Sequence, residues 1–493
     1  MPEAAYAAID LGAESGRVVV GRLGEAQVSL EVVHRFPNLP VRLPDGLHWD
    51  LLSLFREACD GLTKAAGEAR APLDGVGVDA WGVDYGLLDE RHRLLGLPFH
   101  YRDRRTDSTV ATAFERVPRA QQYAATGIQT MPINTVFQLL ADEGSPALAE
   151  ARRIALIPDL FAMWLSGELA NEITAASTTG LLDARSGTWA QPLIARLGLP
   201  QAPFAVEPVE AGTKLGLVLA HHDAAGVPVH AVAGHDTASA FAAAPVRTKR
   251  SAVLSSGTWS LLGLELDEPV LTAEAAGFNL TNERGVAGTI RLLRNVMGLW
   301  LVQECHRRFD LAYEELERLA ADAPADVALF DPDDDAFLAP DDMPAQIAAA
   351  CRDSGQSPPE GPGEVVRSIL TSLACKYRLV LERLIRVTGR EVDVVHVIGG
   401  GARSELLCRL TADLLGRPLL AGPVEATALG NVMVQAFATG RLGSLDDIRA
   451  VAAGSVEPVP FDPTAHREEA ETMYARFLDV TGLAVDEPEP ATA

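Results

Sequence analysis

The chain has 493 residues, more than one hydrophobic core of ordinary size accommodates, so we expect two or more domains. Hydrophobic residues make up 48% of it, which excludes an intrinsically disordered protein. The formal net charge is −25, and a surface this acidic repels nucleic acid and anionic lipid. The start of the chain has no basic segment, no long apolar run follows, and the five cysteines are scattered. We therefore expect a cytoplasmic protein without disulfide bonds that binds neither nucleic acid nor membrane.

The first part of the chain alternates between strand and helix patterns. Residues 6–11 and 17–23 are apolar and partly β-branched, so they predict two strands joined by a small-residue turn. Asp50 is suited to cap a helix, and residues 51–69 place apolar side chains at helical spacing. Residues 73–82 return to a strand pattern. This alternation is typical of α/β layers.

The same plan recurs later in the chain. Residues 251–264 predict a second pair of strands around a Ser-Gly-Thr turn. Residues 392–416 then predict a strand, a glycine turn and a helix, and residues 417–440 a strand, a turn and a helix ended by Gly440. We therefore predict two α/β domains of similar plan with a cleft between them. The acidic stretch at 330–344 lacks the glycine and glutamate of a calcium loop, so we expect it to be a solvated loop.

Residues 231–245, AVAGHDTASAFAAAP, place a carboxylate where an apolar strand gives way to an Ala-rich helix. Asp236 at this junction is suited to cap the helix. It is equally suited to accept a proton from a substrate hydroxyl, because phosphoryl transfer needs little more than a positioned acceptor, a base and charge stabilisation. In that case His235 and Thr237 would bind other hydroxyls of the acceptor. The residues alone leave both interpretations open.

Glycine-rich turns offer places for phosphate. The turn after Asp10 can direct backbone N–H groups at an anion, and Asp10 could hold Mg²⁺, although an ordinary hairpin looks the same. The turn at 255–260 repeats the feature, and three glycines at 399–401 follow a strand and precede a helix. No lysine stands in a Gly-Lys-Ser/Thr motif, so an ATP-dependent reaction here would not use a P-loop.

Eight motifs, in their order along the chain, resemble those of the FGGY family of carbohydrate kinases. They are IDLGAESGR, GVDAWGVDYGLLD, YRDRRT, GHDTASA, LSSGTWSLLG, LLRNVMGLWLVQE, VIGGGARSELL and AGPVEATALGN. The resemblance implies an α/β protein with the duplicated actin-like ATPase (ribonuclease H-like) fold, in which two domains enclose a central cleft. It implies an N-terminal domain at 1–245 that binds sugar and a C-terminal domain at 246–480 that binds nucleotide. We expect residues 481–493 to form a disordered tail.

The resemblance also implies roles for individual residues. Asp236 would be the catalytic base, ATP the phosphoryl donor and Mg²⁺ its cofactor, with Asp10 near the metal. The sugar would contact Gly82, His235, Asp236, Thr237 and Asn295, and ATP would contact Ala13, Glu14, Ser15, Gly16, Arg17, Thr258, Gln303 and Gly401. Glu14 replaces a serine that the family often has, so we expect it to contact ATP through its backbone, with its side chain turned away or paired with Arg17.

Several motifs are most similar to those of family members that phosphorylate L-rhamnulose on O1 in L-rhamnose catabolism. The alternatives are a kinase for another ketose or polyol, such as L-fuculose, L-ribulose or L-xylulose, and a catalytically silent sugar sensor. One pocket side chain can change which hydroxyl pattern is accepted. The sequence leaves open whether the protein is a monomer or a homodimer.

Overall fold

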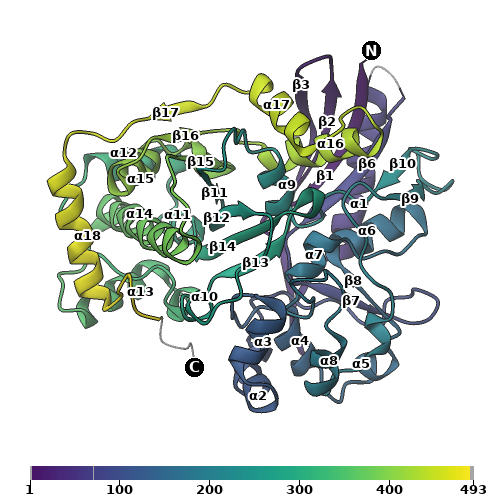
Figure 1. The fold of residues 1–493 in the computed structure, drawn as a ribbon, viewed down its shortest axis with the longest axis horizontal. Helices are drawn as coiled ribbons and strands as arrows, with labels where there is room; N and C mark the ends of the chain where they lie inside the picture. The colour runs from purple at the N-terminus through teal and green to yellow at the C-terminus, as the bar shows by residue number, and fades with distance from the viewer. Residues whose placement is uncertain (1–2, 70–71, 489–493) are drawn as a thin grey trace.

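A computed structural model of the protein describes residues 3–69 and 72–488 (Figure 1). One sheet has the strand order β3-β2-β1-β6-β10-β9, with all its strands in the first half of the chain. The strands are β1 (Ala4–Leu11), β2 (Ser15–Leu23), β3 (Val28–Pro37), β6 (Gly75–Ala80), β9 (Lys214–Leu217) and β10 (Pro228–His230). A second sheet has the order β13-β14-β12-β11-β15-β16-β17. Its strands are β11 (Ser251–Ser256), β12 (Trp259–Leu266), β13 (Thr281–Arg284), β14 (Ile290–Met297), β15 (Val394–Ile398), β16 (Leu419–Ala421) and β17 (Val459–Phe461).

Strand β1 is buried on both faces, which explains its run of small and apolar residues. The odd-numbered side chains from Ala5 to Leu11 pack in one core with α1 (Leu51–Glu68) and α6 (Ile157–Ser166). The even-numbered side chains from Ala4 to Ala8 pack in a different core on the opposite face. Asp10 has the same parity as this second set, so its side chain extends toward the second face.

Helix α9 (Asp236–Ala242) lies between the two sheets, and its alanines make this possible. Ala238 and Ala242 pack in the core of the first sheet, whereas Ala240 and Phe241 pack in a cluster with strands of the second sheet. Small side chains on both faces let one helix contact both layers closely. The expected helix after the Gly-His-Asp-Thr junction is therefore confirmed, and it carries Asp236 to the boundary between the two halves.

A helix from late in the chain completes the first half. Figure 1 shows α16 (Ala426–Ala438) and α17 (Leu445–Ser455), in yellow-green, beside the purple strands β1 to β3. Helix α16 crosses α9 so closely that a Cβ built on Gly430 would lie 1.8 Å from the carbonyl oxygen of Ser239. Gln435 Nε2 donates to the Ala7 carbonyl at 2.9 Å, which fixes α16 against β1.

Further elements extend the first half around its sheet. A separate core holds most of the segment from 85 to 204. Its elements are β7 (Tyr85–Leu88), α2 (Thr109–Arg116), α3 (Arg119–Thr126), α4 (Thr135–Ala141), α5 (Pro146–Glu150), β8 (Arg153–Leu156), α7 (Ile173–Ser177) and α8 (Gln191–Arg196). A short ribbon of β4 (Pro40–Leu43) and β5 (Gly46–Trp49) precedes α1.

The second sheet is covered mainly by α14 (Gly361–Thr388), which is 28 residues long and buried along much of its length. The other helices of this half are α10 (Ala273–Gly277), α11 (Trp300–Phe309), α12 (Tyr313–Asp322), α13 (Met343–Asp353), α15 (Glu405–Leu415) and α18 (Arg467–Thr481). The predicted strand pairs and the Asp50 cap are confirmed, since Asp50 accepts from Ser53 N. The duplicated α/β plan predicted from the sequence is thus present.

Two segments differ from what we expected. The acidic loop is not merely solvated, because the buried Lys376 of α14 lies 2.9 Å from Asp331 and 3.3 Å from Asp333. After α18, the main chain of the expected disordered tail accepts hydrogen bonds from Arg383 at Ala484 and Glu487. Residues 489–493 lie outside the described residues. Within residues 3–69 and 72–488, no helix has the length and hydropathy that a membrane crossing requires.

Candidate active site

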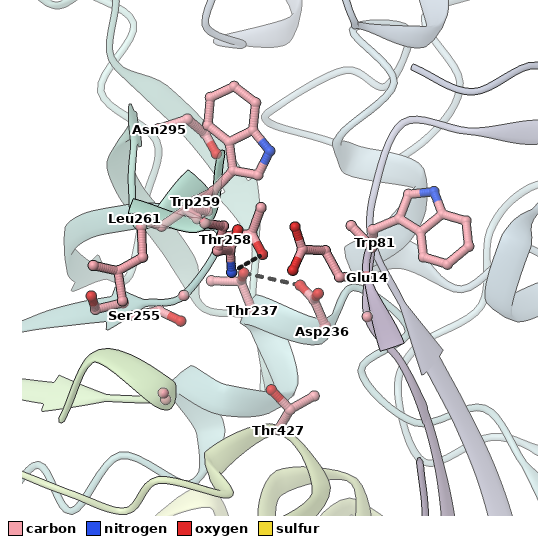
Figure 2. Close-up of a pocket in the computed structure, with 18 of the residues that line it drawn as sticks. Glu14, Trp81, Asp236, Thr237, Ser255, Thr258, Trp259, Leu261, Asn295 and Thr427 are labelled. Carbon is pink, nitrogen blue, oxygen red and sulfur yellow. Dashed lines mark hydrogen bonds between the residues drawn. The ribbon is translucent and has the colours of Figure 1, made fainter. Parts of the chain in front are cut away.

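A cavity of about 940 Å³ lies between the two halves. Figure 2 shows Asp236 and Thr237 inside it, with Trp81 and Glu14 on one side and Thr258 and Trp259 on the other. The volume falls at the upper end of the range for pockets that bind small molecules and cofactors. Most of the candidate residues line it: Asp10, Ala13, Glu14, Ser15, Arg17, Gly82, His235, Asp236, Thr237, Thr258, Asn295 and Gln303.

Asp236 is the first residue of α9, but its side chain does not cap the helix. His235 occupies the cap position, and no side chain makes a capping hydrogen bond there. Thr237 Oγ1 instead donates to Asp236 Oδ1 at 3.0 Å. Burial raises the pKa of Asp236, and the neighbouring Asp10 adds to this effect, while His235 opposes it. A carboxylate with a raised pKa is a stronger base, as proton abstraction requires.

Beneath the junction lies a second buried carboxyl group, which the sequence did not single out. Glu172 Oε2 accepts from the backbone N–H of Gly234 at 2.9 Å. It also accepts from the N–H and Oγ1 of Thr174, and Thr174 Oγ1 in turn accepts from His235 N at 3.2 Å. The backbone that presents Asp236 is therefore held by direct hydrogen bonds to α7.

The hairpin of β1 and β2 contributes an ion-pair network at the end of the cavity where the sequence predicts the nucleotide. Arg17 Nη2 lies 2.6 Å from Asp10 Oδ2, and Arg17 Nη1 lies 2.5 Å from Glu425 Oε2. Glu425 lines the cavity and precedes α16. Sequence reasoning missed it although its motif, AGPVEATALGN, was among those noticed, because nothing in the motif indicates that it meets Arg17.

Glu14 turns away from Arg17. Its Oε1 lies 2.9 Å from Nη2 of Arg307, a residue of α11 in the second half. This contact joins the two walls at the edge of the cavity. The alternative in which Glu14 pairs with Arg17 is therefore not observed, since Asp10 and Glu425 already occupy that guanidinium.

The turn at 255–260 lies across the cavity from the turn between β1 and β2. Gln303 Nε2 donates to Thr258 Oγ1 at 3.3 Å, so these two candidate nucleotide contacts are adjacent. Gly16 and Gly401 lie outside the cavity lining, unlike Gly399 and Gly400. A Cβ on Gly401 would lie 2.0 Å from Ser256 Oγ, and one on Gly16 would lie 2.2 Å from the Phe36 ring. At both positions a side chain would collide with the residue packed behind the turn, so this close packing favours glycine.

The opposite end of the cavity has aromatic walls and a strained backbone. Gly82 lies against Thr178, whose Oγ1 accepts from Val83 N at 3.0 Å. Val83 has a φ of 68°, a conformation that a β-branched residue rarely adopts and that costs about 1–3 kcal/mol. Such strain at a cavity wall is typical of functional sites.

A buried carboxyl group supports these walls. Asp84 Oδ2 accepts from the indole N–H of Trp49 at 2.6 Å and of Trp81 at 3.0 Å. Burial raises the pKa of Asp84 to about 6. Arg105 of the YRDRRT motif pairs with Asp142 at 2.6 Å, so this arginine stabilises the fold beside the cavity.

Asn295 is held in one orientation by its neighbour from the first half. Gln129 Oε1 accepts from the backbone N–H of Asn295 at 2.9 Å and from its side-chain Nδ2 at 3.1 Å, while Gln129 Nε2 donates to the Asn295 carbonyl. With Nδ2 donating to protein, Asn295 Oδ1 is the atom suited to accept from a ligand hydroxyl. Sequence reasoning missed Gln129, which lies 166 residues away.

Among the described residues, no group of three or more His, Cys, Asp or Glu side chains is arranged to hold a metal ion. Magnesium that arrives with a nucleotide needs fewer protein ligands, because phosphate oxygens and water complete its shell. Asp10 lines the cavity, and Asp79, beside it in the register of β1 and β6, has a buried Oδ1 without a hydrogen-bond partner. These carboxyl oxygens fit the ligand chemistry of Mg²⁺.

Comparison with known proteins identifies the family. Residues 5–242 match the N-terminal domain, and residues 252–439 the C-terminal domain, of the FGGY family of carbohydrate kinases. The chain is 40% identical over 465 residues to a rhamnulokinase of Bacteroides thetaiotaomicron, with 93% of this chain and 96% of that protein covered. It is 40% identical over 489 residues to a rhamnulokinase of Pectobacterium carotovorum, with 98% and 97% covered.

Solved structures share the fold at lower identity. A gluconate kinase from Lactobacillus acidophilus superposes with a TM-score of 0.79 at 13% identity, covering 97% of each chain. A Plasmodium falciparum glycerol kinase with ADP gives a TM-score of 0.77 at 15% identity, covering 97% of this chain and 98% of that one. The predicted actin-like fold is thereby confirmed. Because both family domains are present along one chain, the protein is an enzyme of the FGGY family of carbohydrate kinases.

Proposed function

We propose that the enzyme transfers the γ-phosphoryl group of ATP to O1 of L-rhamnulose, as a step of L-rhamnose catabolism. The observation that carries the mechanism is the position of Asp236, a half-buried carboxyl group in the cavity between the two glycine-rich turns and the aromatic walls. The identity of the sugar is supported by relatives named rhamnulokinase at 40% identity over nearly the whole chain.

In the proposed reaction, Asp236 accepts the proton of the 1-hydroxyl group while that oxygen attacks the γ-phosphorus. The new O–P bond forms as the bond between the γ-phosphorus and the bridging oxygen breaks, and ADP leaves with the bonding electrons. His235, Thr237, Gly82 and Asn295 would hold the sugar. Exclusion of water by the two halves would suppress ATP hydrolysis.

At the nucleotide end, backbone N–H groups of Ala13, Ser15 and their neighbours would contact phosphate, with Thr258 and Gln303 opposite. The guanidinium group of Arg17 would be held in place by its two carboxylate partners, Asp10 and Glu425. Asp10 would hold Mg²⁺, which when bound offsets negative charge on the phosphate oxygens. Gly16 and Gly401 would contact ATP through their backbone, and their lack of a side chain lets Phe36 and Ser256 pack closely behind them.

Replacing Asp236 with Asn should reduce kcat by about 10²–10⁴ while sugar still binds, because only the proton acceptor is lost. The matched control is Asp60→Asn, the same chemical change on the exposed face of α1. Near-normal turnover of D236N would refute Asp236 as the base.

The substrate is tested with Mg·ATP and L-rhamnulose beside L-fuculose, L-ribulose, L-xylulose and glycerol, with the product phosphate located by ³¹P NMR. We expect a clear preference for L-rhamnulose with phosphate on O1. Preference for another sugar would overturn the substrate but leave Asp236 in its role. No turnover with any sugar, with ATP still bound, would favour a silent sugar sensor.

A further inference from the structure

A fully buried arginine lies directly behind the cavity wall. Arg291 of β14 stands opposite Glu283 of β13 in the antiparallel register, and its Nη2 lies 3.1 Å from Glu283 Oε2. The two side chains are 0% and 5% exposed. Glu283 lines the cavity, whereas Arg291 stands behind it. Because desolvation cancels most of the attraction in a buried ion pair, stability alone gives little reason for this one.

Arg291 also contacts the residue next to the proposed base. Its Nη2 is hydrogen-bonded to His235 Nδ1 at 3.2 Å. A guanidinium group has donors only, so Nδ1 must be the acceptor and can carry no hydrogen. The hydrogen of the imidazole is then on Nε2, which lies 3.5 Å from Asp236 Oδ1.

Glu283 offers a competing arrangement, since its Oε2 lies 3.2 Å from the same Nδ1 and could accept a hydrogen from it. The geometry favours Arg291, because its contact with His235 is aligned as a hydrogen bond while Glu283 Oε2 has no aligned partner. Burial raises the pKa of Glu283, but Arg291, His235 and Asn295 outweigh this and lower the pKa to about 2. Glu283 is therefore a carboxylate that balances the charge of Arg291.

We propose that Arg291 is a positioning residue that acts through His235, holding the imidazole with its hydrogen on Nε2 and directed at Asp236 and the sugar. This role rests on the proposed function of Asp236 as the base. Oδ1 of Asp236 then faces two donors, Thr237 Oγ1 and His235 Nε2, and Oδ2 is left to take the proton of the sugar hydroxyl. When sugar is bound, Nε2–H is also placed to donate to a sugar oxygen.

The arrangement links the two halves of the enzyme. His235 belongs to the junction before α9, whereas Arg291 and Glu283 belong to the hairpin of β13 and β14 in the second sheet. The same hairpin contacts α7, where Ser177 Oγ accepts from Arg284 N at 3.0 Å. The imidazole of His235 is therefore oriented by groups of the second half, while the backbone of His235 is held by the first half.

The test replaces the ion pair with apolar residues of similar size in the double variant R291M/E283L, which leaves no lone buried charge. The matched control is R378M/E382L, which removes another Arg–Glu pair, 2.9 Å apart on α14, whose residues do not line the cavity. The ring hydrogens of His235 are located by long-range ¹H–¹⁵N NMR, with the signal assigned by its loss in H235A. We expect hydrogen on Nε2 in the wild type and the control, and loss of that preference in R291M/E283L.

Kinetics separate positioning from a general loss of structure. In R291M/E283L we expect kcat/KM for the sugar to fall about tenfold to a hundredfold, the effect of small misplacements at a reacting centre. The KM for ATP should stay within about twofold. In an H235A background the same pair of substitutions should change kcat/KM by no more than about twofold, because the residue through which Arg291 acts is already gone.

Two results would overturn the proposal. One is hydrogen on Nδ1 in the wild type, which would assign Glu283 as the partner of the imidazole. The other is an equal loss of kcat/KM with and without His235. If the wild type phosphorylates none of the sugars, the proposed function fails, but the NMR measurement still decides the orientation of His235.

Discussion

Replacing Glu172 with Gln should make the stability of the enzyme less dependent on pH. Glu172 is fully buried beneath the Gly-His-Asp-Thr junction, and burial raises its pKa from 4.5 to about 7 despite the hydrogen bonds that Thr174, Gly234 and Ala175 donate. Gln keeps an acceptor oxygen at the position of Oε2. Its amide group would take the place of Oε1, which has no hydrogen-bond partner.

The sign and size of this change in pH dependence follow from the linkage between protonation of Glu172 and folding. Because the folded state holds the proton more tightly than the unfolded state, Glu172 contributes most stability below pH 4.5, where both states are protonated. As the pH rises toward 7, the unfolded state gives up its proton first and that stability is lost. A displacement from 4.5 to about 7 corresponds to about 3 kcal/mol. The change in stability of E172Q relative to wild type should therefore become more favourable by that amount between about pH 4.5 and pH 8.

The assay is urea unfolding of both proteins at several pH values across this interval, followed by circular dichroism. The matched control is Glu115→Gln on the exposed side of α2, whose difference from wild type should not vary with pH. If the difference between E172Q and wild type stays constant within about 0.5 kcal/mol, a typical surface-substitution effect, the burial argument is refuted.

Two further substitutions test the interface between the halves. Gly430→Ala should destabilise the enzyme by about 1–3 kcal/mol and lower kcat, because its Cβ would displace α9 and thereby Asp236. The control is Gly67→Ala in α1, where a Cβ meets nothing within 4 Å, and it should instead stabilise the enzyme by about 0.5–1 kcal/mol. Equal melting temperatures of the two variants would contradict the prediction. Glu14→Gln should lower the KM for ATP up to about fivefold at low salt and less at high salt, because it removes a negative charge beside the phosphates and frees Arg307. The ion pair between Glu14 and Arg307 is exposed, so its loss should leave stability nearly unchanged. An unchanged KM at low salt would show that Glu14 lies too far from the phosphates to matter.

The elements that could be predicted from the sequence were those with local patterns. The strand pairs, the Asp50 cap and the helix after Asp236 follow from apolar periodicity and turn residues within about 20 positions. Family motifs then indicated most residues of the cavity lining. They also included Gly16 and Gly401, because a motif does not distinguish a glycine that faces ligand from one that lets Phe36 or Ser256 pack closely.

What the sequence could not indicate depends on partners far along the chain. Glu425 meets Arg17, and Arg291 meets His235, across the boundary between the halves. The acidic loop looked solvated because its partner, Lys376, lies 45 residues from Asp331, on the buried side of α14. A buried charge in a helix is recognisable as unusual, but its partner is known only once the chain is folded.

The position of α16 has a consequence for synthesis of the protein on the ribosome. The second face of β1 packs against α9 and against α16, which ends at Ala438, so this face is only partly covered when residue 245 leaves the ribosome. At ordinary elongation rates the remaining residues take roughly 10–40 s to synthesise, during which Tyr6, Ala8 and their neighbours stay open to solvent and to other nascent chains. We therefore expect the N-terminal half to depend on chaperones until translation is almost complete, and its expression alone to give an aggregating fragment.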